Sequence, residues 1–305
     1  ESLKVGDYTE SVDETQKLID SRPDIQRPME NLNRGAVAVR MDGYTYISWR
    51  WLGTESADTR YNIYRSLTEM SSYGQKINNE PLNATNFTDL FIASDDTQYF
   101  IVPVVNGEEQ WDKVGAVQLW DNNYMDIPIQ KPENNKVNGE EYSYTPGDAS
   151  VGDLDGDGEY ELVVKWDCAP RDNSQAGLTG NVYLDAYKLN GKKLWRIDLG
   201  KNIRAGAHYT QFLVYDFDMD GKAEVACKTA PGSIDGVGKY VSETSSVDEI
   251  RNANDNTVSY VNQNGYILDG NEYFTAFDGE TGKTIDTIYY PIPRLDYESW
   301  GDTNG

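Results

Sequence analysis

The chain has 305 residues, of which 27 are basic and 51 acidic, so its formal net charge at pH 7 is −24. Nucleic acids and anionic membranes are poor partners for such a surface, because binding to either depends on neutralisation of phosphate by Lys and Arg. The length and the 38% apolar content allow a large core or two domains. No apolar run approaches the ~20 residues that a membrane-spanning helix requires.

The first 30 residues are polar and charged without a clear period, and we expect residues 1–30 to form a lead-in segment. They contain no apolar signal core. We therefore expect that any export signal was removed or was never present.

Residues 31–126 have the pattern of short strands divided by turns. Residues 36–41 and 44–51 are rich in β-forming residues and flank Asp42-Gly43, which predicts a hairpin. Residues 114–120 predict one further strand. Strands and turns at this spacing favour an antiparallel β-sandwich of fibronectin type III character.

Aromatic residues are expected to form the core of this sandwich: Trp49, Tyr61, Tyr64 and Tyr99. Residues 127–138 follow, with two prolines and several polar residues, and are expected to form a linker. From residue 139 to residue 305 the pattern changes and repeats.

Two acidic loops stand out in this second region. Both place carboxylates at positions 1, 3, 5 and 9 and Gly at position 6, and calcium prefers such a shell of hard oxygen ligands. The expected ligands are Asp153, Asp155, Asp157 and Glu161 with the carbonyl of Glu159 in the first loop, and Asp216, Asp218, Asp220 and Glu224 with the carbonyl of Lys222 in the second.

An EF-hand begins in the same way but requires a carboxylate at position 12 and flanking helices. Position 12 is Val164 in one loop and Cys227 in the other, and β-rich sequence follows both. The alternative is a solvated acidic turn without an ion. Because the same positions are filled twice, we favour calcium-binding loops that connect strands.

The sequence after each loop also repeats. Residues 185–191 and 275–279 each place an aromatic strand before a turn that contains Gly. Repetition of an all-β unit with one calcium loop per unit is typical of propeller blades. Residues 231–268 form an insertion rich in Gly, Ser and Asn, and insertions of this kind often build a binding cleft.

Several segments resemble the rhamnogalacturonan lyases of polysaccharide lyase family 11: 147–161, 172–175, 179–183 and 194–212. The resemblance implies a fibronectin-like domain, an eight-bladed propeller, bound Ca²⁺ and secretion from the cell. It also implies β-elimination on an acidic polysaccharide, rhamnogalacturonan I, with endo and exo cleavage both open. Family members continue beyond the position of Gly305, so we expect a complementary C-terminal fragment that completes the propeller.

Strand alternation selects the first candidate site residues. Lys165 and Asp167 are expected on the same strand face as Glu161, whereas Val164 and Trp166 are expected on the opposite face, toward the core. The resemblance places the position of Asp167 in the substrate cleft. It also places the position of Gly147 there, where the family usually has Asn.

The reaction requires a cation or hydrogen-bond donor beside the uronate carboxylate and a base that removes the proton from C5. Arg204, His208 and Lys165 are the candidates for catalysis, and the base itself is not identified. Substrate binding is predicted for Asp167, Lys165, Arg171, Asn173 and Arg204.

Two alternatives stay open at this point. The propeller could be a calcium-stabilised module that binds glycans or proteins without catalysis. The two cysteines, Cys168 and Cys227, could form one bridge or remain separate buried thiols.

Overall fold

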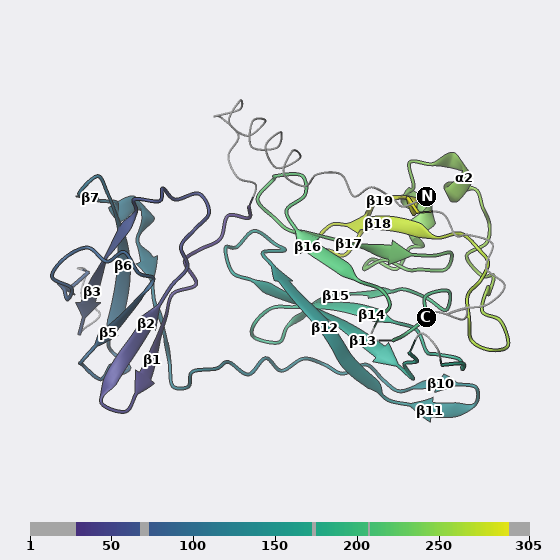
Figure 1. Ribbon diagram of the computed structural model, residues 1–305, viewed down its shortest axis with the longest axis horizontal. Helices are drawn as coiled ribbons and strands as arrows, with labels where there is room; N and C mark the ends of the chain where they lie inside the picture. The colour runs from purple at the N-terminus through teal and green to yellow at the C-terminus, as the bar shows by residue number, and fades with distance from the viewer. Residues whose placement is uncertain (1–28, 68–72, 173–174, 207, 293–305) are drawn as a thin grey trace, which may run out of the picture.

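A computed structural model describes residues 29–67, 73–172, 175–206 and 208–292, and Figure 1 shows two β-rich parts joined along the long axis of the molecule. The expectation of an all-β protein is confirmed for these residues. Helical structure there is limited to three short segments: η1 (Trp111–Lys113), η2 (Val241–Thr244) and α2 (Asp248–Arg251). No helix in the described part of the chain has the length and apolar character that crossing a membrane requires.

The first part contains two sheets that enclose a common core. The strands are β1 (Val37–Met41), β2 (Tyr44–Ser48), β5 (Asn86–Asp89) and β9 (Gln118–Trp120) in one sheet, and β3 (Arg60–Ser66), β4 (Gln75–Lys76), β6 (Gln98–Val105), β7 (Glu108–Glu109) and β8 (Gly115–Ala116) in the other. Ala38 and Ile47 of one sheet and Ile63 and Ile101 of the other are fully buried in this core. The arrangement is therefore a β-sandwich.

The hairpin predicted around Asp42-Gly43 is confirmed, since β1 and β2 pair antiparallel with Met41 opposite Tyr44. The single strand predicted for 114–120 is wrong. β8 pairs with β6 and β9 pairs in parallel with β1, so the chain crosses between the sheets at Val117. Alternation of side chains continues through such a crossing, and the sequence pattern therefore does not reveal it.

Three of the four aromatic residues expected in the core are buried there: Trp49, Tyr61 and Tyr99. Tyr64 is only half-buried, because its hydroxyl donates a hydrogen bond to Glu109 at 2.7 Å and its ring packs edge-on against Trp111.

The second part contains two four-stranded antiparallel meanders. The strands are β12 (Tyr144–Gly152), β13 (Glu161–Cys168), β14 (Tyr183–Tyr187) and β15 (Lys193–Asp198) in the first, and β16 (Phe212–Tyr215), β17 (Glu224–Thr229), β18 (Tyr273–Phe277) and β19 (Thr284–Tyr289) in the second. Each acidic loop connects the first two strands of its sheet. The repeat seen in the sequence is thus a repeat of topology.

A short hairpin precedes the first meander. Its strands are β10 (Asn135–Val137) and β11 (Glu140–Tyr142), joined through Asn138-Gly139. The last residues of the expected linker 127–138 therefore belong to a strand. Asn138 and Gly139 both have positive φ, +53° and +85°, which is the conformation that this tight turn requires.

The two meanders pack against each other through apolar side chains that include Val163, Leu184, Val225 and Phe277. On the other face of the first meander, Val164 and Trp166 pack with Tyr144, Tyr187 and Val137 of the β10–β11 hairpin in a separate cluster. The alternation predicted along β13 is correct, but the expectation of one core face is wrong. Both faces of β13 are covered, so even Lys165 is buried.

The two cysteines lie on β13 and β17, are both buried and are not bridged. Burial in apolar surroundings raises the pKa of the Cys227 thiol to about 12. Of the two alternatives, the structure has the separate thiols.

Candidate metal and substrate sites

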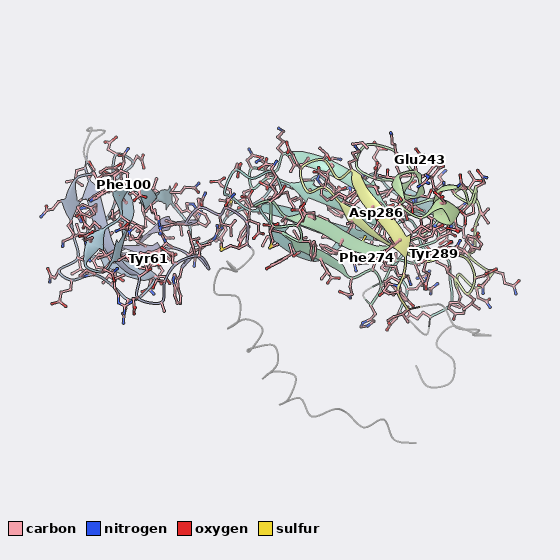
Figure 2. The ribbon with its side chains drawn as sticks, turned by 90° about the horizontal axis from the view of Figure 1, so that it is seen from above. Tyr61, Phe100, Glu243, Phe274, Asp286 and Tyr289 are labelled. Atoms are coloured by element: carbon pink, nitrogen blue, oxygen red, sulfur yellow. The ribbon has the colours of Figure 1, made fainter. Side chains whose placement is uncertain are left out.

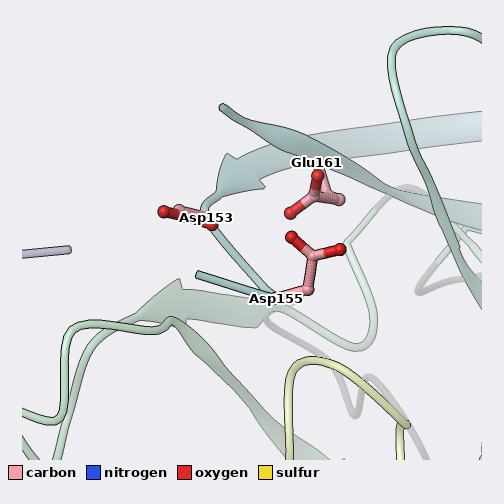
Figure 3. A group of neighbouring side chains, drawn as sticks. All are labelled: Asp153, Asp155 and Glu161. Atoms are coloured by element: carbon pink, nitrogen blue, oxygen red, sulfur yellow. The ribbon is translucent and has the colours of Figure 1, made fainter. Parts of the chain in front are cut away.

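The first acidic loop brings three carboxylates together. Asp153, Asp155 and Glu161 each offer an oxygen, and these oxygens lie within 4.8 Å of one another (Figure 3). The loop backbone fixes two of them: Asp153 accepts the N–H groups of Gly156 and Gly158 at 2.8 and 2.9 Å, and Glu161 accepts that of Leu154 at 2.8 Å. The side chains are therefore held in place by the loop itself.

The second loop repeats this geometry position by position. Asp216, Asp218 and Glu224 form the corresponding group. Asp216 accepts the N–H groups of Met219 and Gly221 at 2.7 and 3.0 Å, and Glu224 accepts that of Phe217 at 2.8 Å. In both loops the carboxylates at positions 1, 3 and 9 converge as the spacing predicts.

The fourth carboxylate of each loop lies outside these groups. Asp157 accepts the N–H of Glu159 at 2.9 Å, and Asp220 accepts that of Lys222 at 2.8 Å, so both close the turn instead. The Glu159 side chain contacts Gln118 at 3.1 Å. A ligand role for these positions stays a prediction, and for Glu159 and Lys222 it concerns the backbone carbonyl.

The three converging carboxylates fit a hard cation on two further observations. Asp155 Oδ1 is buried and has no hydrogen-bond partner within the described residues. Burial raises the pKa of Asp153 and Glu161 in the first loop and of Glu224 in the second. Each group of carboxylates is therefore costly to ionise without a compensating positive charge. Calcium, with its preference for carboxylate oxygens, matches that requirement.

One ammonium group enters the first loop from the residue that follows β14. Lys188 Nζ lies 2.6 Å from Asp155 Oδ2, 2.7 Å from Asp157 Oδ2 and 3.3 Å from Glu161 Oε1. Burial lowers the pKa of Lys188, but hydrogen bonds to Asp155 and Asp157 outweigh it, and the pKa lies above its usual value. The residue that follows β18 as Lys188 follows β14 is Asp278, and its carboxylate accepts hydrogen bonds from Thr281 N at 2.8 Å and from Thr281 Oγ1.

The two loops lie side by side and share a third segment. Ala223 N donates to Asp153 O at 2.8 Å, which joins the loops directly. Asn31 N donates to Gly221 O at 3.1 Å and Asn33 N to Gly158 O at 2.8 Å. Residues 31–33, which we call the clip, therefore contact position 6 of both loops just before the chain enters the sandwich. Sequence reasoning missed the clip, because backbone donors leave no pattern in the side chains.

Lys165 and Asp167 form a polar group inside the second part. Lys165 Nζ lies 2.9 Å from Asp148 Oδ2, 3.0 Å from the Tyr209 carbonyl oxygen and 3.9 Å from Asp167 Oδ2. A Cβ at Gly147 would lie 2.8 Å from Asp167 Oδ2, so a glycine at this position leaves room for the carboxylate.

Asp167 has the features of a group that meets a ligand. It is 6% exposed, and its Oδ1 has no hydrogen-bond partner in the described part of the chain. Burial raises the pKa of Asp167, and the charge of Lys165 and the backbone N–H of Gly206 oppose that rise. The strand alternation that placed Asp167 beside Lys165 is thus observed, and one carboxylate oxygen is free to accept a hydrogen bond.

Arg204 has a different environment from the one expected of a catalytic group. It is 4% exposed, and its guanidinium donates to the carbonyl oxygens of Gly177 (3.1 Å), Gly265 and Gln175. It also lies 5.2 Å from the centre of the Tyr266 ring. These contacts join the 231–268 insertion to the loop after β13. The predicted roles of Arg204 in catalysis and substrate binding stay predictions. The sequence could not reveal which carbonyls a buried arginine would find.

The other predicted residues lie near the surface. His208 is exposed, and its Nε2 lies 3.6 Å from Asp172 Oδ1. Arg171 is half-buried and its Nε has no partner within the described residues. Asn173 lies outside the described residues. Their predicted roles stay predictions.

Comparison with known proteins gives two family matches in chain order. Residues 27–120 match the rhamnogalacturonan I lyases beta-sheet domain, and residues 124–305 match rhamnogalacturonan lyase family 11, C-terminal domain. The boundary between them falls at the junction of the two parts seen in the structure.

Two curated relatives come from Bacillus subtilis (strain 168). Rhamnogalacturonan endolyase YesW is 50% identical over 281 residues, with 92% of this chain and 42% of the relative covered. Rhamnogalacturonan exolyase YesX is 44% identical over 283 residues, with 92% and 43% covered. The chain thus spans about two fifths of the length of the relatives it matches.

Solved structures agree with these matches. The crystal structure of rhamnogalacturonan lyase YesW has a TM-score of 0.77 at 49% identity, covering 92% of this chain and 45% of that one. Bacillus licheniformis Rhamnogalacturonan Lyase PL11 has a TM-score of 0.74 at 46% identity, covering 88% and 43%.

Proposed function

The chain belongs to rhamnogalacturonan lyase family 11, and from this premise we propose that it forms part of a secreted enzyme that cleaves rhamnogalacturonan I by β-elimination. The observation that carries the proposal is the identity of 50% over 281 residues with a rhamnogalacturonan endolyase, which extends through both parts of the chain. The buried Lys165–Asp167 pair supplies a polar group suited to a sugar ligand within that region.

The two meanders are, in this proposal, successive blades of a propeller. Leu213 and Tyr215 on β16 and Ile288 on β19 are exposed on the face of the second meander that does not meet the first. Phe274 and Asp286 lie on the adjacent strands β18 and β19 (Figure 2). An apolar sheet face of this kind supports packing against a further blade, because propellers close with about 4–8 blades. Sequence that the relatives have and this chain does not span would supply those blades.

Calcium is the ion proposed for both acidic loops. Asp153, Asp155 and Glu161 would hold it in the first, and the corresponding set would do so in the second. When bound, calcium supplies the positive charge that lets these buried carboxylates stay ionised, and it thereby stiffens the loops.

In the proposed reaction, a base removes the proton from C5 of a galacturonate, and its electron pair forms the C4–C5 double bond. The C4–O bond to the preceding residue breaks, and the leaving oxygen takes up a proton. Lys165 orients Asp167 through its charge, with 3.9 Å between Nζ and Oδ2. Asp167 Oδ1 accepts a hydrogen bond from a hydroxyl group of the bound sugar. The base is proposed to be His208 or a residue of the blades beyond this chain.

The test uses the protein with its full set of blades on rhamnogalacturonan I, with homogalacturonan as the control substrate. Ultraviolet absorbance from the conjugated unsaturated uronate should increase on the first and stay flat on the second. Asp167→Asn should lower the rate at least tenfold, whereas Asp42→Asn, in the exposed turn between β1 and β2, should not. Saturated products would indicate a hydrolase, and binding without turnover would favour the calcium-stabilised binding module.

A further inference from the structure

A second concave region lies between the sandwich and the first acidic loop. It is a cavity of about 850 Å³, within the ~300–1,000 Å³ range of small-ligand sites. Arg34, Arg50 and Lys113 line it from the sandwich, and Glu159 and Tyr160 line it from the loop. Neither Lys165 nor Asp167 belongs to its lining, so this junction cleft is separate from the candidate substrate site.

The charge of the junction cleft is opposite in sign to that of the whole chain. Arg34 and Glu55 neutralise each other through two contacts, one of them at 2.6 Å. Arg50 and Lys113 make no ion pair within the described residues, and Glu159 is the remaining acid in the lining. The cleft therefore carries a small positive excess in a protein of net charge −24. A local excess of this kind selects an anionic ligand.

Arg50 is positioned as a recognition group. Its guanidinium stacks over the Tyr160 ring with Cζ 4.1 Å from the ring centre, and Nη1 donates to Asn33 O at 3.2 Å. These contacts fix the plane of the group and leave other N–H donors for a ligand, and a guanidinium matches the geometry of a carboxylate. Gly35 makes the position possible, because a Cβ there would lie 2.7 Å from Arg50 Cζ.

An independent observation comes from the wall of the cleft. Arg34 is 5% exposed, and its Nε has no hydrogen-bond partner in the described part of the chain. A buried donor without a partner costs free energy, and a ligand oxygen or an ordered water would remove that cost.

Aromatic and amide groups complete the lining. Trp120 is half-buried and offers flat apolar surface. Gln110 and Gln118 offer amide oxygens, while their amide nitrogens donate to Glu108 O and Glu159 Oε1. Cations, flat rings and amides in one cleft suit a ligand that combines a carboxylate, an apolar ring face and hydroxyl groups. A uronic acid has this combination.

We propose that the junction cleft binds a uronate residue of an acidic oligosaccharide, with the carboxylate at Arg50 and Lys113 and the ring against Trp120. The choice of a uronate over other carboxylates rests on the proposed function. Such a site holds the polymer beside the first blade and offsets the repulsion between two acidic molecules.

Binding to this chain tests the proposal without any turnover. Isothermal titration calorimetry would compare a galacturonate trisaccharide, the matching neutral galactose trisaccharide, and acetate. The galacturonate trisaccharide should bind, and more weakly as salt increases, whereas the neutral trisaccharide should bind at least tenfold more weakly. Acetate binding as tightly as the trisaccharide would overturn the assignment to a uronate.

Two variants locate the site, and a third is the control. Lys113→Gln, at an exposed residue without an ion pair, should weaken binding roughly tenfold, as expected for the loss of one charged hydrogen bond. Arg50→Lys should weaken it further, because an ammonium group cannot form the paired contact. Lys239→Gln, an exposed change far along the chain, should leave binding unchanged.

Unchanged affinity in both cleft variants would overturn the proposal, and so would an equal loss with Lys239→Gln. The lyase assay is independent of this result. Uronate binding without elimination in the complete protein would reject the proposed function alone, and elimination without cleft binding would reject this inference alone.

Discussion

The two acidic loops have the same carboxylate geometry but different surroundings. In the first, Lys188 supplies an internal positive charge among the carboxylates. In the second, the residue at the corresponding chain position is Asp278, and no ammonium group pairs with Asp216, Asp218 or Glu224 within the described residues. The carboxylates of the first loop are also more buried, since Asp155 is half-buried and its counterpart Asp218 is exposed. The repeated motif thus determines where the carboxylates lie. Whether a lysine outside the motif pairs with them determines how strongly each loop requires a bound cation.

The largest expected effect is that of calcium removal. A chelator should lower the melting temperature by several degrees, because an ion at 100–1,000 times its Kd stabilises the folded state by about 3–4 kcal/mol. The comparison predicts that most of this loss comes from the second loop, which has no internal ammonium. Differential scanning calorimetry with and without calcium should therefore give a much smaller calcium-dependent shift for Asp218→Asn than for Asp155→Asn. Equal shifts would contradict the proposed difference between the loops.

Substitution of Lys188 and of Asp278 should make the calcium dependence of the two loops more alike. Lys188→Met should destabilise the chelated protein by about 2 kcal/mol, because carboxylates that were paired lose their partner. Calcium should reverse that loss, and the calcium affinity of the first loop should increase. Asp278→Lys should lower the calcium affinity of the second loop, and it should also destabilise the turn after β18, because the Asp278 carboxylate accepts hydrogen bonds from Thr281.

Lys222→Met is the matched control for this exchange. Lys222 is a half-buried lysine whose ammonium pairs with Glu280 at 2.9 Å, outside the group of Asp216, Asp218 and Glu224. The substitution should leave both stability and calcium affinity nearly unchanged, since a solvent-screened ion pair contributes little to stability. Calcium titration followed by tryptophan fluorescence or calorimetry measures all three variants.

A smaller effect is expected in the pH dependence of stability. Burial raises the pKa of Glu224 above its ordinary value of 4.5, so without metal the folded state holds this proton more tightly than the unfolded state. The free energy of unfolding of the chelated protein should therefore decrease as the pH rises from 4.5 through the raised pKa of Glu224. With calcium bound the carboxylate is held ionised, and stability should instead decrease as pH falls.

The control for this pH profile is Glu224→Gln, which removes the titrating group while keeping most of the shape. The difference between wild type and Glu224→Gln in melting temperature, measured from pH 4 to 7 in chelator, isolates the contribution of this one carboxyl. A difference that does not change with pH would contradict the raised pKa.

The predictions from sequence succeeded where neighbours in the chain determine the geometry. Loop spacing placed Asp153, Asp155 and Glu161 together, and strand alternation placed Lys165 beside Asp167. They did not include the contacts that join segments far apart in the chain. Lys188 reaches Asp157 from 31 residues away, and Arg204 reaches the Gly265 carbonyl from 61 residues away. No local pattern encodes such contacts, because they depend on how two sheets and an insertion pack.

The smallest expected effect concerns the clip. Removal of one backbone N–H donor at a time tests its contact with each loop separately. Proline has no N–H, so Asn33→Pro removes the donor to Gly158 O in the first loop, and Asn31→Pro removes the donor to Gly221 O in the second. Each should destabilise the protein by about 1 kcal/mol, the typical net contribution of one hydrogen bond. Each should also loosen the junction between the sandwich and the loops, which limited proteolysis between residues 29 and 35 would detect. Asn33→Ala keeps the N–H and loses only the side-chain contact to Gly35 N at 2.6 Å, so it should be cleaved more slowly than Asn33→Pro.

If the loops differ as proposed, calcium should protect the junction of Asn33→Pro more than that of Asn31→Pro, because the second loop, where calcium contributes most, then remains attached. Equal protection of the two proline variants would mean that the clip does not transmit the difference between the loops.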